Sequence, residues 1–224
     1  MPAHFLKSLD NYEHHLKRWK MPGFDADFEK NALAVFKKFI NSVELPCHRE
    51  TLCGHITGSC LIVTPDLKRV LLTHHRKLNL WLQLGGHADG NANIAEVAYR
   101  EGIEESGLAK LKFVDIANLL GISAPADLMP LDIDFHKIPQ RKTEPEHIHY
   151  DIRYLLCAED PESIVISDES NQLKWFTFAE AFAITEEPSM HRQFKKTLWL
   201  KEVIETSDHL SLDNIYSDLT FEGA

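Results

Sequence analysis

The stretch from Gly86 to Leu108, GHADGNANIAEVAYREGIEESGL, contains the strongest structural signal in the sequence. Asn93 followed by Glu96 has the spacing of a capping box, in which the two side chains bond to each other's backbone N–H groups at the start of a helix. Gly107, followed by the apolar Leu108, is typical of a left-handed residue that ends a helix. We therefore expect one helix between these two signals.

Three carboxylates share one side of this helix. At about 100° per residue, Glu101, Glu104 and Glu105 project within about a third of the circumference. The other members of the same stripe are apolar, which distinguishes it from a solvated acidic face. Like charges three and four residues apart repel one another, and partial burial increases the repulsion. Because Mg²⁺ and Mn²⁺ prefer oxygen ligands, a divalent cation would remove this repulsion. The pattern therefore predicts a metal site.

These residues resemble the signature of the Nudix hydrolases, which reads Gly, five residues, Glu, seven residues, Arg-Glu, aliphatic, any, Glu-Glu, any, Gly, aliphatic. The residues that match in spacing and identity are Gly86, Arg100, Glu101, Glu104, Glu105, Gly107 and Leu108. Ala92 stands where the signature has its first Glu, which affects the rigidity of the loop more than metal binding. Gly102 replaces the aliphatic residue at a cost of ~1 kcal/mol relative to Ala, so we expect close packing at this point.

The resemblance implies hydrolysis of a diphosphate linkage in a nucleoside diphosphate derivative or a similar small diphosphate compound. The cofactor that it implies is Mg²⁺, with Mn²⁺ as a substitute. Carried over residue by residue, the metal ligands are Glu101, Glu104, Glu105 and the backbone carbonyl of Gly86. Arg100 would orient this cluster. A cation held there would neutralise the phosphates and lower the pKa of a bound water.

Further residues are candidates for catalysis and substrate binding. The proton acceptor is one of the helix carboxylates or Glu169, which precedes an expected strand, with Glu146 as the next candidate. Polar and apolar residues alternate from His147 to Cys157, so that the polar side chains share one face of a strand. An ordinary half-exposed strand without a role in binding is the alternative for 147–157. For the basic residues at 74–77, the alternative is a cationic surface loop. The residues expected to contact substrate are Arg76, Lys77, His87, His147, His149 and Asp151.

The order of the remaining elements, together with the resemblance, predicts an α/β fold: a Nudix-like α/β/α sandwich with a mixed β-sheet and a helical N-terminal extension. Runs rich in β-branched residues at 59–64 and 70–73 flank Pro65–Asp66, a dipeptide typical of a hairpin turn. Further strands are expected at 81–84, 113–119, 147–157 and 173–176, and further helices at 178–183 and 191–205. The proline-rich stretch 124–146 is expected to form a long loop.

Three regions are expected along the chain. They are the helical N-terminal extension at 1–45, the Nudix-like catalytic domain at 46–206 and an acidic C-terminal tail at 207–224. The N-terminal segment has apolar residues at helical spacing and no catalytic motif. It is therefore expected to serve packing or dimerisation, and a homodimer is one of the arrangements that it allows.

Composition excludes several classes of protein. The chain has 24 Lys and Arg against 34 Asp and Glu, a net charge of −10, which argues against a long nucleic acid as partner. A small anionic substrate remains compatible because a bound metal bridges it to the carboxylates. No apolar run reaches the ~20 residues that a membrane helix needs. The start of the sequence, Met1 to His4, lacks the features of a secretory signal, so the expected location is the cytoplasm.

Cysteine usage supports the same compartment. Four cysteines among 224 residues do not make a disulfide framework. Cys47, His48, Cys53 and His55 lie close together in the sequence but lack the Cys-x-x-Cys pair of many zinc sites. They are therefore interpreted as free thiols and surface histidines.

Two alternatives to hydrolysis remain open. An enzyme similar to isopentenyl diphosphate isomerase would also bind a metal and a diphosphate, and Cys60 and the Gly86–His87 pair are the residues in its favour. A Nudix-like module that binds a ligand or regulates a partner without turnover is the other alternative, and Ala92 is the feature that supports it. The intact run from Arg100 to Gly107 favours hydrolysis.

Overall fold

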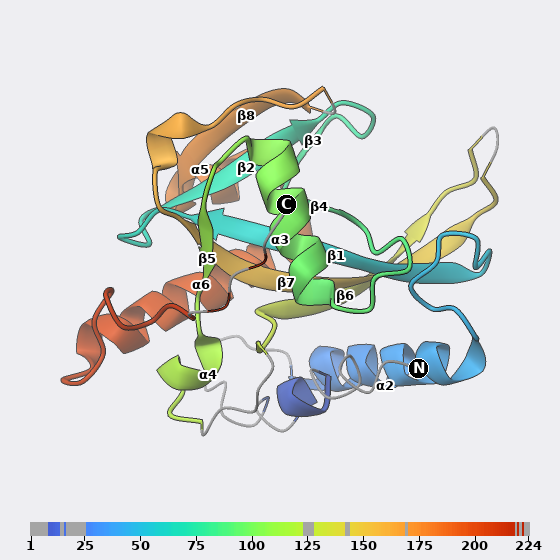
Figure 1. Cartoon of the computed structure of the whole chain (residues 1–224), viewed down its shortest axis with the longest axis horizontal. Coiled ribbons are helices and arrows are strands. Elements are labelled where there is room, and N and C mark those ends of the chain that lie inside the picture. Colours follow the sequence, from blue (N-terminus) through green and yellow to red (C-terminus); the bar gives the residue numbers. More distant parts are fainter. Residues whose placement is uncertain are drawn as a thin grey trace.

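The computed structural model describes residues 9–13, 16, 26–122, 128–141, 144–168, 170–217, 219 and 221. The described residues form a mixed sheet of eight strands (Figure 1). These strands are β1 (Gly54–Val63), β2 (Arg69–His75), β3 (Leu80–Leu82), β4 (Leu84–His87), β5 (Leu111–Phe113), β6 (Asp132–Ile138), β7 (His147–Ala158) and β8 (Ser170–Thr177). The predicted mixed sheet is therefore confirmed.

Strands β1 and β7 form the centre of the sheet. They run parallel over ten residue pairs, from Gly54 opposite Ile148 to Val63 opposite Cys157. The other pairings are antiparallel: β1 with β2 and β4, β2 with β3 and β8, and β7 with β5 and β6. Every residue of β1 is buried. The continuous apolar character of its second half reflects this burial on both faces.

Helices lie on both faces of the sheet (Figure 1). They are α2 (Ala26–Ser42), α3 (Ile94–Ser106), α4 (Ile116–Leu119), α5 (Phe178–Ile184) and α6 (Pro188–Thr206). Helix α3 lies directly on β1, since a Cβ atom at Gly58 would be 2.9 Å from Cγ1 of Val97. On the opposite face, Gln193 of α6 donates to Gln83, just before β4, at 3.3 Å. This arrangement is the expected α/β/α sandwich.

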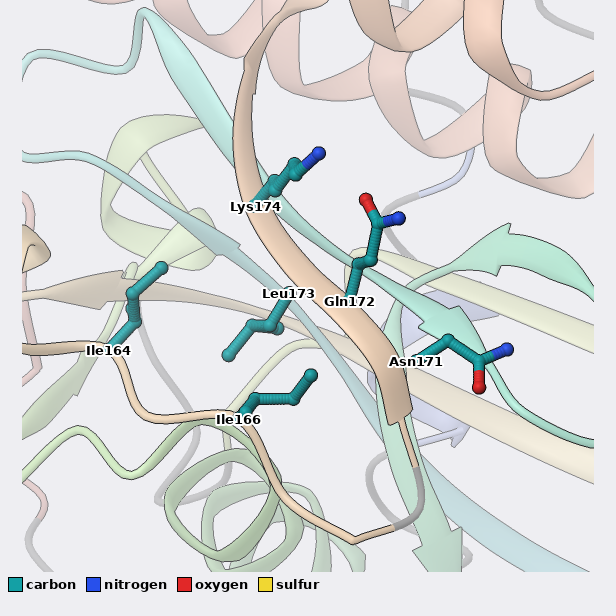
Figure 2. Close-up of a pocket in the computed structure, with 6 residues that line it drawn as sticks. All are labelled: Ile164, Ile166, Asn171, Gln172, Leu173 and Lys174. Atoms are coloured by element: carbon teal, nitrogen blue, oxygen red, sulfur yellow. The ribbon is translucent and has the colours of Figure 1, made fainter.

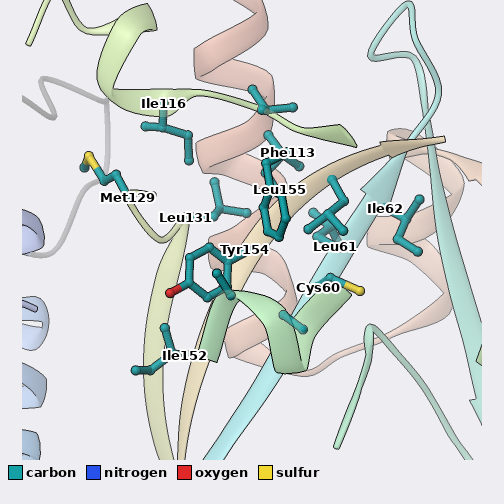
Figure 3. Packing of buried hydrophobic residues seen from close by; sticks show 14 of the residues in the cluster. Cys60, Leu61, Ile62, Phe113, Ile116, Met129, Leu131, Ile152, Tyr154 and Leu155 are labelled. Atoms are coloured by element: carbon teal, nitrogen blue, oxygen red, sulfur yellow. The ribbon is translucent and has the colours of Figure 1, made fainter. Parts of the chain in front are cut away.

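The hydrophobic core joins the two central strands to the helices and to the segment before β6 (Figure 3). Side chains that the figure labels in this core are Cys60, Leu61, Ile62, Phe113, Ile116, Met129, Leu131, Ile152, Tyr154 and Leu155. All of them are buried, and most are branched or aromatic, as expected for residues on a sheet. Burying such side chains is worth roughly 1.5–3 kcal/mol each, which makes this cluster the main source of stability.

Helix α3 begins and ends where the sequence predicts. The side chain of Asn93 accepts a hydrogen bond from the backbone N–H of Glu96 at 3.4 Å. Gly107 has φ of 66°, the left-handed conformation that favours glycine, and its N–H donates to the carbonyl of Ile103 at 2.9 Å. These local signals fix the orientation of the carboxylate stripe relative to the strands beneath it.

Gly102 allows α3 to approach the sheet closely. A Cβ atom there would lie 2.9 Å from Cδ1 of Leu111 and 3.0 Å from Sγ of Cys60. We predict that Gly102→Ala gains none of the ~1 kcal/mol that this change gives in an exposed helix. We also predict that Gly102→Val lowers the free energy of unfolding by about 1–3 kcal/mol through overpacking. Urea denaturation of both variants tests this, and stabilisation by Gly102→Ala would contradict the close approach.

Two expected elements are wrong. The stretch 113–119 is not a strand: β5 ends at Phe113 and α4 begins at Ile116. Asp115 caps this short helix, because its side chain accepts a hydrogen bond from the N–H of Asn118 at 3.0 Å. The stretch 124–146 is not one long loop, since it contains β6, which pairs with β7 from Asp132 opposite Arg153 to Ile138 opposite His147. Within that stretch, residues 123–127 and 142–143 lie outside the described part of the chain.

A buried group of charges attaches the N-terminal region to the sheet. Lys196 of α6 lies 2.6 Å from Glu29 of α2 and 2.7 Å from Asp132 of β6, with all three side chains fully buried. Tyr12 donates to Glu29 at 2.6 Å and accepts from Lys196 at 2.7 Å. The N-terminal helical residues that are described therefore pack on their own chain, and a homodimer stays a prediction. None of the described helices has the length and apolar composition needed to cross a membrane.

Candidate functional site

The site is organised by the contact between α3 and strand β4. Gly58 on β1 and Gly86 on β4 are paired in register, and both lie beneath the helix. The absence of a side chain at Gly58 lets Val97 contact the strand backbone directly. The helix face that carries the carboxylates is therefore held next to the Gly85–Gly86 backbone.

Glu105 is bound to the first glycine of this pair. Its Oε2 accepts a hydrogen bond from the N–H of Gly85 at 3.0 Å, and only 9% of the residue is exposed. Gly85 has φ of 156°, and a Cβ atom there would lie 2.6 Å from Cα of Ser59. A side chain at position 85 is therefore excluded, and the backbone N–H is left facing the carboxylate.

Glu101 lies against the second glycine. A Cβ atom at Gly86 would be 2.5 Å from the carboxyl carbon of Glu101. Arg100 donates to Oε1 of Glu101 at 2.8 Å and to the carbonyl of His87 at 3.2 Å. Arg100 thus ties the helix to β4 and contacts Glu101, and its role in orienting a metal site stays a prediction.

The donor set of this site suits a hard divalent cation. Glu101 and Glu105 are held at the β4 backbone, and Glu104, on the same side of the helix, is exposed. Burial, followed by the negative charges of Glu105 and Glu101, raises the pKa of the fully buried Cys60 thiol well above its usual value. Mg²⁺ binding would relieve the negative potential that these two carboxylates create. The residues therefore fit the expected metal.

Asp151 lies on the face of the sheet opposite α3. Its Oδ1 accepts hydrogen bonds from Thr57 at 2.9 Å and Ser59 at 2.7 Å. Its Oδ2 accepts from Arg153 at 2.7 Å and from Gln83 at 3.3 Å. Asp151 is 2% exposed, so its carboxylate accepts hydrogen bonds from side chains inside the protein. Direct contact of Asp151 with a substrate stays a prediction.

Histidines from three strands gather beside Asp151. One ring nitrogen from each of His55, His87 and His149 lies within 4.8 Å of the others, and the ring of His147 is 4.9 Å from that of His55. Burial, followed by the neighbouring histidines, lowers the pKa of His55 to about 4 and that of His149 to about 2. Both rings are therefore neutral at pH 7.

The cluster includes a residue that sequence reasoning assigned wrongly. His55 was expected on the surface, but it is 3% exposed and lies on the face of β1 opposite α3. The four cysteines are free, as expected, with Cys47 buried and Cys53 exposed. The alternation of His55, Thr57 and Ser59 indicates that these polar side chains share one face of a strand. The pairing of β1 with β7, which brings His149 beside His55, cannot be predicted from this alternation.

Three of the remaining expected residues, Arg76, Lys77 and Glu146, are exposed. Arg76 and Lys77 are exposed in the turn after β2, and Arg76 donates to the carbonyl of Ser170 at 3.4 Å. Glu146 forms an exposed ion pair with Lys137 at 2.7 Å. Glu169 lies outside the described residues.

A shallow hollow of about 360 Å³ lies along β8 (Figure 2). Its lining is Ile164, Ile166, Asn171, Gln172, Leu173 and Lys174. Figure 2 shows the three apolar side chains turned toward one another and those of Gln172 and Lys174 turned away. None of the residues expected from the sequence to take part in catalysis lines it. The carboxylates and histidines that could bind a metal lie instead on α3 and β4 and in the histidine cluster.

Comparisons with known proteins agree with this geometry. The chain matches the family model for the NUDIX domain over residues 55–198. A NUDIX-family hydrolase from Clostridium perfringens superimposes with a TM-score of 0.50 at 25% identity, covering 65% of this chain and 97% of that one. An Ap4A hydrolase from C. elegans gives 0.48 at 17% identity, with 64% and 95% covered.

The dihydroneopterin triphosphate pyrophosphohydrolase of E. coli gives a TM-score of 0.44 at 18% identity, with 63% of this chain and 92% of that chain covered. A search among curated proteins returned no match. The family model covers more than half of the chain and includes all the residues of the α3–β4 site. This chain therefore belongs to the Nudix family and is a Nudix-type hydrolase.

Proposed function

We propose that the protein is a Mg²⁺-dependent pyrophosphohydrolase that cleaves a diphosphate linkage in a small compound, such as a nucleoside diphosphate derivative. The observation that carries this proposal is the position of Glu101 and Glu105 against the backbone of Gly85 and Gly86. Two partly buried carboxylates beside one strand backbone repel each other, and a divalent cation would offset that repulsion beyond the charge that Arg100 brings to Glu101. A diphosphate is the substrate that such a cation attracts.

Each residue of the α3–β4 site has a defined role in this proposal. Glu101, Glu104 and Glu105 would hold Mg²⁺ together with the carbonyl of Gly86, and Arg100 would keep Glu101 in position. When bound there, Mg²⁺ supplies charge neutralisation for the diphosphate and lowers the pKa of a coordinated water. Proton acceptance from that water falls to one of these carboxylates or to Glu169.

Residues on neighbouring strands would add contacts to the substrate. His87 directly follows Gly86 on β4, but its side chain projects to the opposite face of the strand from Glu101, toward His55 and His149. Its contact with the substrate therefore stays a prediction. Arg76 and Lys77 place positive charge after β2, where a terminal phosphate would be attracted. In an acidic protein, these cations and the metal explain how an anionic substrate is accepted.

Turnover measurements test the proposal. A panel of nucleoside diphosphate sugars, dinucleoside polyphosphates and nucleoside triphosphates is incubated with the protein, with Mg²⁺ or with EDTA. We expect at least one compound to be cleaved at a diphosphate linkage, with activity lost in EDTA and restored by excess Mg²⁺. Equal turnover in EDTA would contradict the assigned role of the carboxylates.

The structure does not favour either alternative to hydrolysis. Cys60, the residue that resembles the isomerase, is fully buried beneath Gly102 of α3, and its thiol is neutral. Ala92, the feature that supports a module without turnover, is half-buried and packs against the core. It is therefore compatible with an intact loop before α3.

Gly86→Ala is expected to impair metal binding specifically. The added methyl group would lie 2.5 Å from the Glu101 carboxyl carbon, so the carboxylate must move away from the β4 backbone. We predict a fall in kcat/KM of about 10–100-fold, comparable to changes that misplace metal ligands, together with a higher Mg²⁺ concentration for half-maximal activity.

Gly121→Ala is the matched control for Gly86→Ala. A Cβ atom at Gly121, which has φ of 62°, meets nothing within 4 Å, so this change adds a methyl group without displacing a carboxylate. Its activity and Mg²⁺ dependence are expected to equal those of the parent protein. An unchanged Mg²⁺ dependence in Gly86→Ala would show that Glu101 does not bind the cation.

A further inference from the structure

We propose that His55, His87 and His149 form a second metal site, which takes a first-row transition metal such as Zn²⁺ or Co²⁺ and is separate from the carboxylate site. Each residue brings one ring nitrogen within 4.8 Å of the other two. Three imidazoles around one point are a frequent ligand set for such metals. Mg²⁺ prefers oxygen ligands and is a poor match.

His55 provides the strongest indication of a missing ligand. It is 3% exposed, and neither Nδ1 nor Nε2 has a hydrogen-bond partner among the described residues. Leaving a buried polar group without a partner is costly, so buried ring nitrogens are ordinarily satisfied. A metal ion on one nitrogen of His55 would remove part of this cost.

Strand pairing fixes the three rings on one face of the sheet. His55 on β1 is opposite His149 on β7, and Thr57, two residues further on β1, is opposite His87 on β4. Paired residues, and residues two apart on a strand, share a face. The ring centroids are 4.8 Å apart for His55 and His149, 5.0 Å for His55 and His87, and 5.1 Å for His87 and His149.

The same alternation separates this cluster from the carboxylates. Gly86 faces α3, where Glu101 lies against it. His87 is the next residue on β4, so its side chain projects to the opposite face, toward His55 and His149. The two sites therefore share the backbone of β4 but lie on its two sides.

His147 is arranged as a further ligand beside the three. Its Nδ1 lies 2.9 Å from the carbonyl of Pro145, which can only accept a hydrogen bond, so Nδ1 carries the proton. Its Nε2 is then unprotonated and lies 3.2 Å from Nε2 of His149. A ring that donates to a backbone carbonyl through one nitrogen and offers the other is typical of histidines that bind metals.

The spacing requires only a small adjustment. With Zn–N bonds of about 2.0–2.1 Å, tetrahedral ligand atoms are roughly 3.4 Å apart. The Nε2 atoms of His147 and His149, which are 3.2 Å apart, are already close to this separation. The ligand nitrogens of His55, His87 and His149 lie within 4.8 Å of one another, so each pair would need to close by at most about 1.4 Å. The cluster is thus close to a geometry that it can adopt with a metal bound.

Cobalt titration of the untagged, EDTA-treated protein tests the proposal. We expect one Co²⁺ to bind with the intense visible absorption of a tetrahedral imidazole site, and one Zn²⁺ to abolish that absorption. A hundredfold excess of Mg²⁺ is expected to leave it unchanged. X-ray absorption of the zinc form is expected to show imidazole scattering with Zn–N of about 2.0–2.1 Å. No such absorption in the parent protein would overturn the proposal, whatever the variants do.

Matched variants locate the metal. His149→Ala and His87→Ala are expected to lower Co²⁺ affinity at least 100-fold, whereas His209→Ala removes an exposed imidazole far along the sequence and is expected to change nothing. The double change Glu101→Gln with Glu104→Gln is expected to retain the visible absorption, which separates this site from the proposed hydrolytic one. Unchanged absorption in a folded His87→Ala/His149→Ala protein, checked by circular dichroism, would overturn the assignment.

Discussion

Replacing Glu105 by Gln is expected to lower kcat/KM for hydrolysis of the diphosphate substrate by at least about 100-fold, or about 2.7 kcal/mol of transition-state stabilisation. Gln keeps the shape and an oxygen that can accept from the N–H of Gly85, so the contact of α3 with β4 is preserved. Only the negative charge is lost, and with it a ligand for Mg²⁺. Glu104→Gln is expected to give a similar loss.

Glu96→Gln is the control on the same helix. Glu96 lies in the first turn of α3 and projects away from the carboxylate stripe, so its charge is not expected to affect turnover. Steady-state kinetics over a range of Mg²⁺ concentrations compare the variants. Activity in Glu104→Gln and Glu105→Gln equal to that of Glu96→Gln would show that the roles of these carboxylates are assigned wrongly.

Replacing Lys196 by Met is expected to lower the free energy of unfolding by about 3–5 kcal/mol, the cost of breaking a buried ion pair by removing one partner. The change removes the ammonium group that lies 2.6 Å from Glu29 and 2.7 Å from Asp132, and Arg192 remains 3.9 Å from Glu29. Burial already raises the pKa of Glu29, and the positive charge of Lys196 is the largest influence that lowers it. Without Lys196, Glu29 is expected to take up a proton more readily.

Lys195→Met is the matched control, because the neighbouring lysine on α6 is exposed. Its free energy of unfolding is expected to stay within about 0.5 kcal/mol of the parent value. Chemical denaturation followed by circular dichroism measures both variants. If Lys196→Met lowered the free energy of unfolding no more than Lys195→Met, the ion pairs of Lys196 with Glu29 and Asp132 would not hold α2 to the sheet.

The parts of the fold that the sequence predicts are those with local causes. Helix α3 is predicted to within its first and last residues because Asn93 and Gly107 act on neighbouring backbone groups. The carboxylate side of the helix follows from helical geometry alone. The hairpin of β1 and β2 follows in the same way from Pro65–Asp66 between two β-rich runs.

The parts that sequence reasoning missed depend on contacts between distant residues. Strand β6 is held by pairing with β7, and its Asp132 and Asp134 are buried because Arg153 and Arg192 lie beside them. Aspartates are uncommon in strands, so a segment that buries two of them lacks the sequence pattern that predicts a strand. The histidine cluster is a similar case, because His55 meets His149 through the pairing of β1 with β7 and His87 through the pairing of β1 with β4.

The structure shows where some of the negative charge of this acidic protein is located. By itself, the net charge of −10 argues against a long nucleic acid as partner. Glu101 and Glu105 place part of that charge at one point of the β4 backbone, where a bound cation would offset it. In the proposed function, the distribution of charge at the site, more than its sum, would decide whether an anionic substrate is accepted.

Hydrolysis in water enriched in ¹⁸O is the most direct test of the central claim, that α3 and β4 form a site for metal-dependent hydrolysis of a diphosphate. The protein is incubated with Mg²⁺ and a cleaved compound from the panel, and the products are examined by mass spectrometry. We predict one ¹⁸O atom in one of the two phosphate-containing products, and no such product with Glu105→Gln. Consumption of the compound without ¹⁸O in either product would contradict hydrolysis at this site.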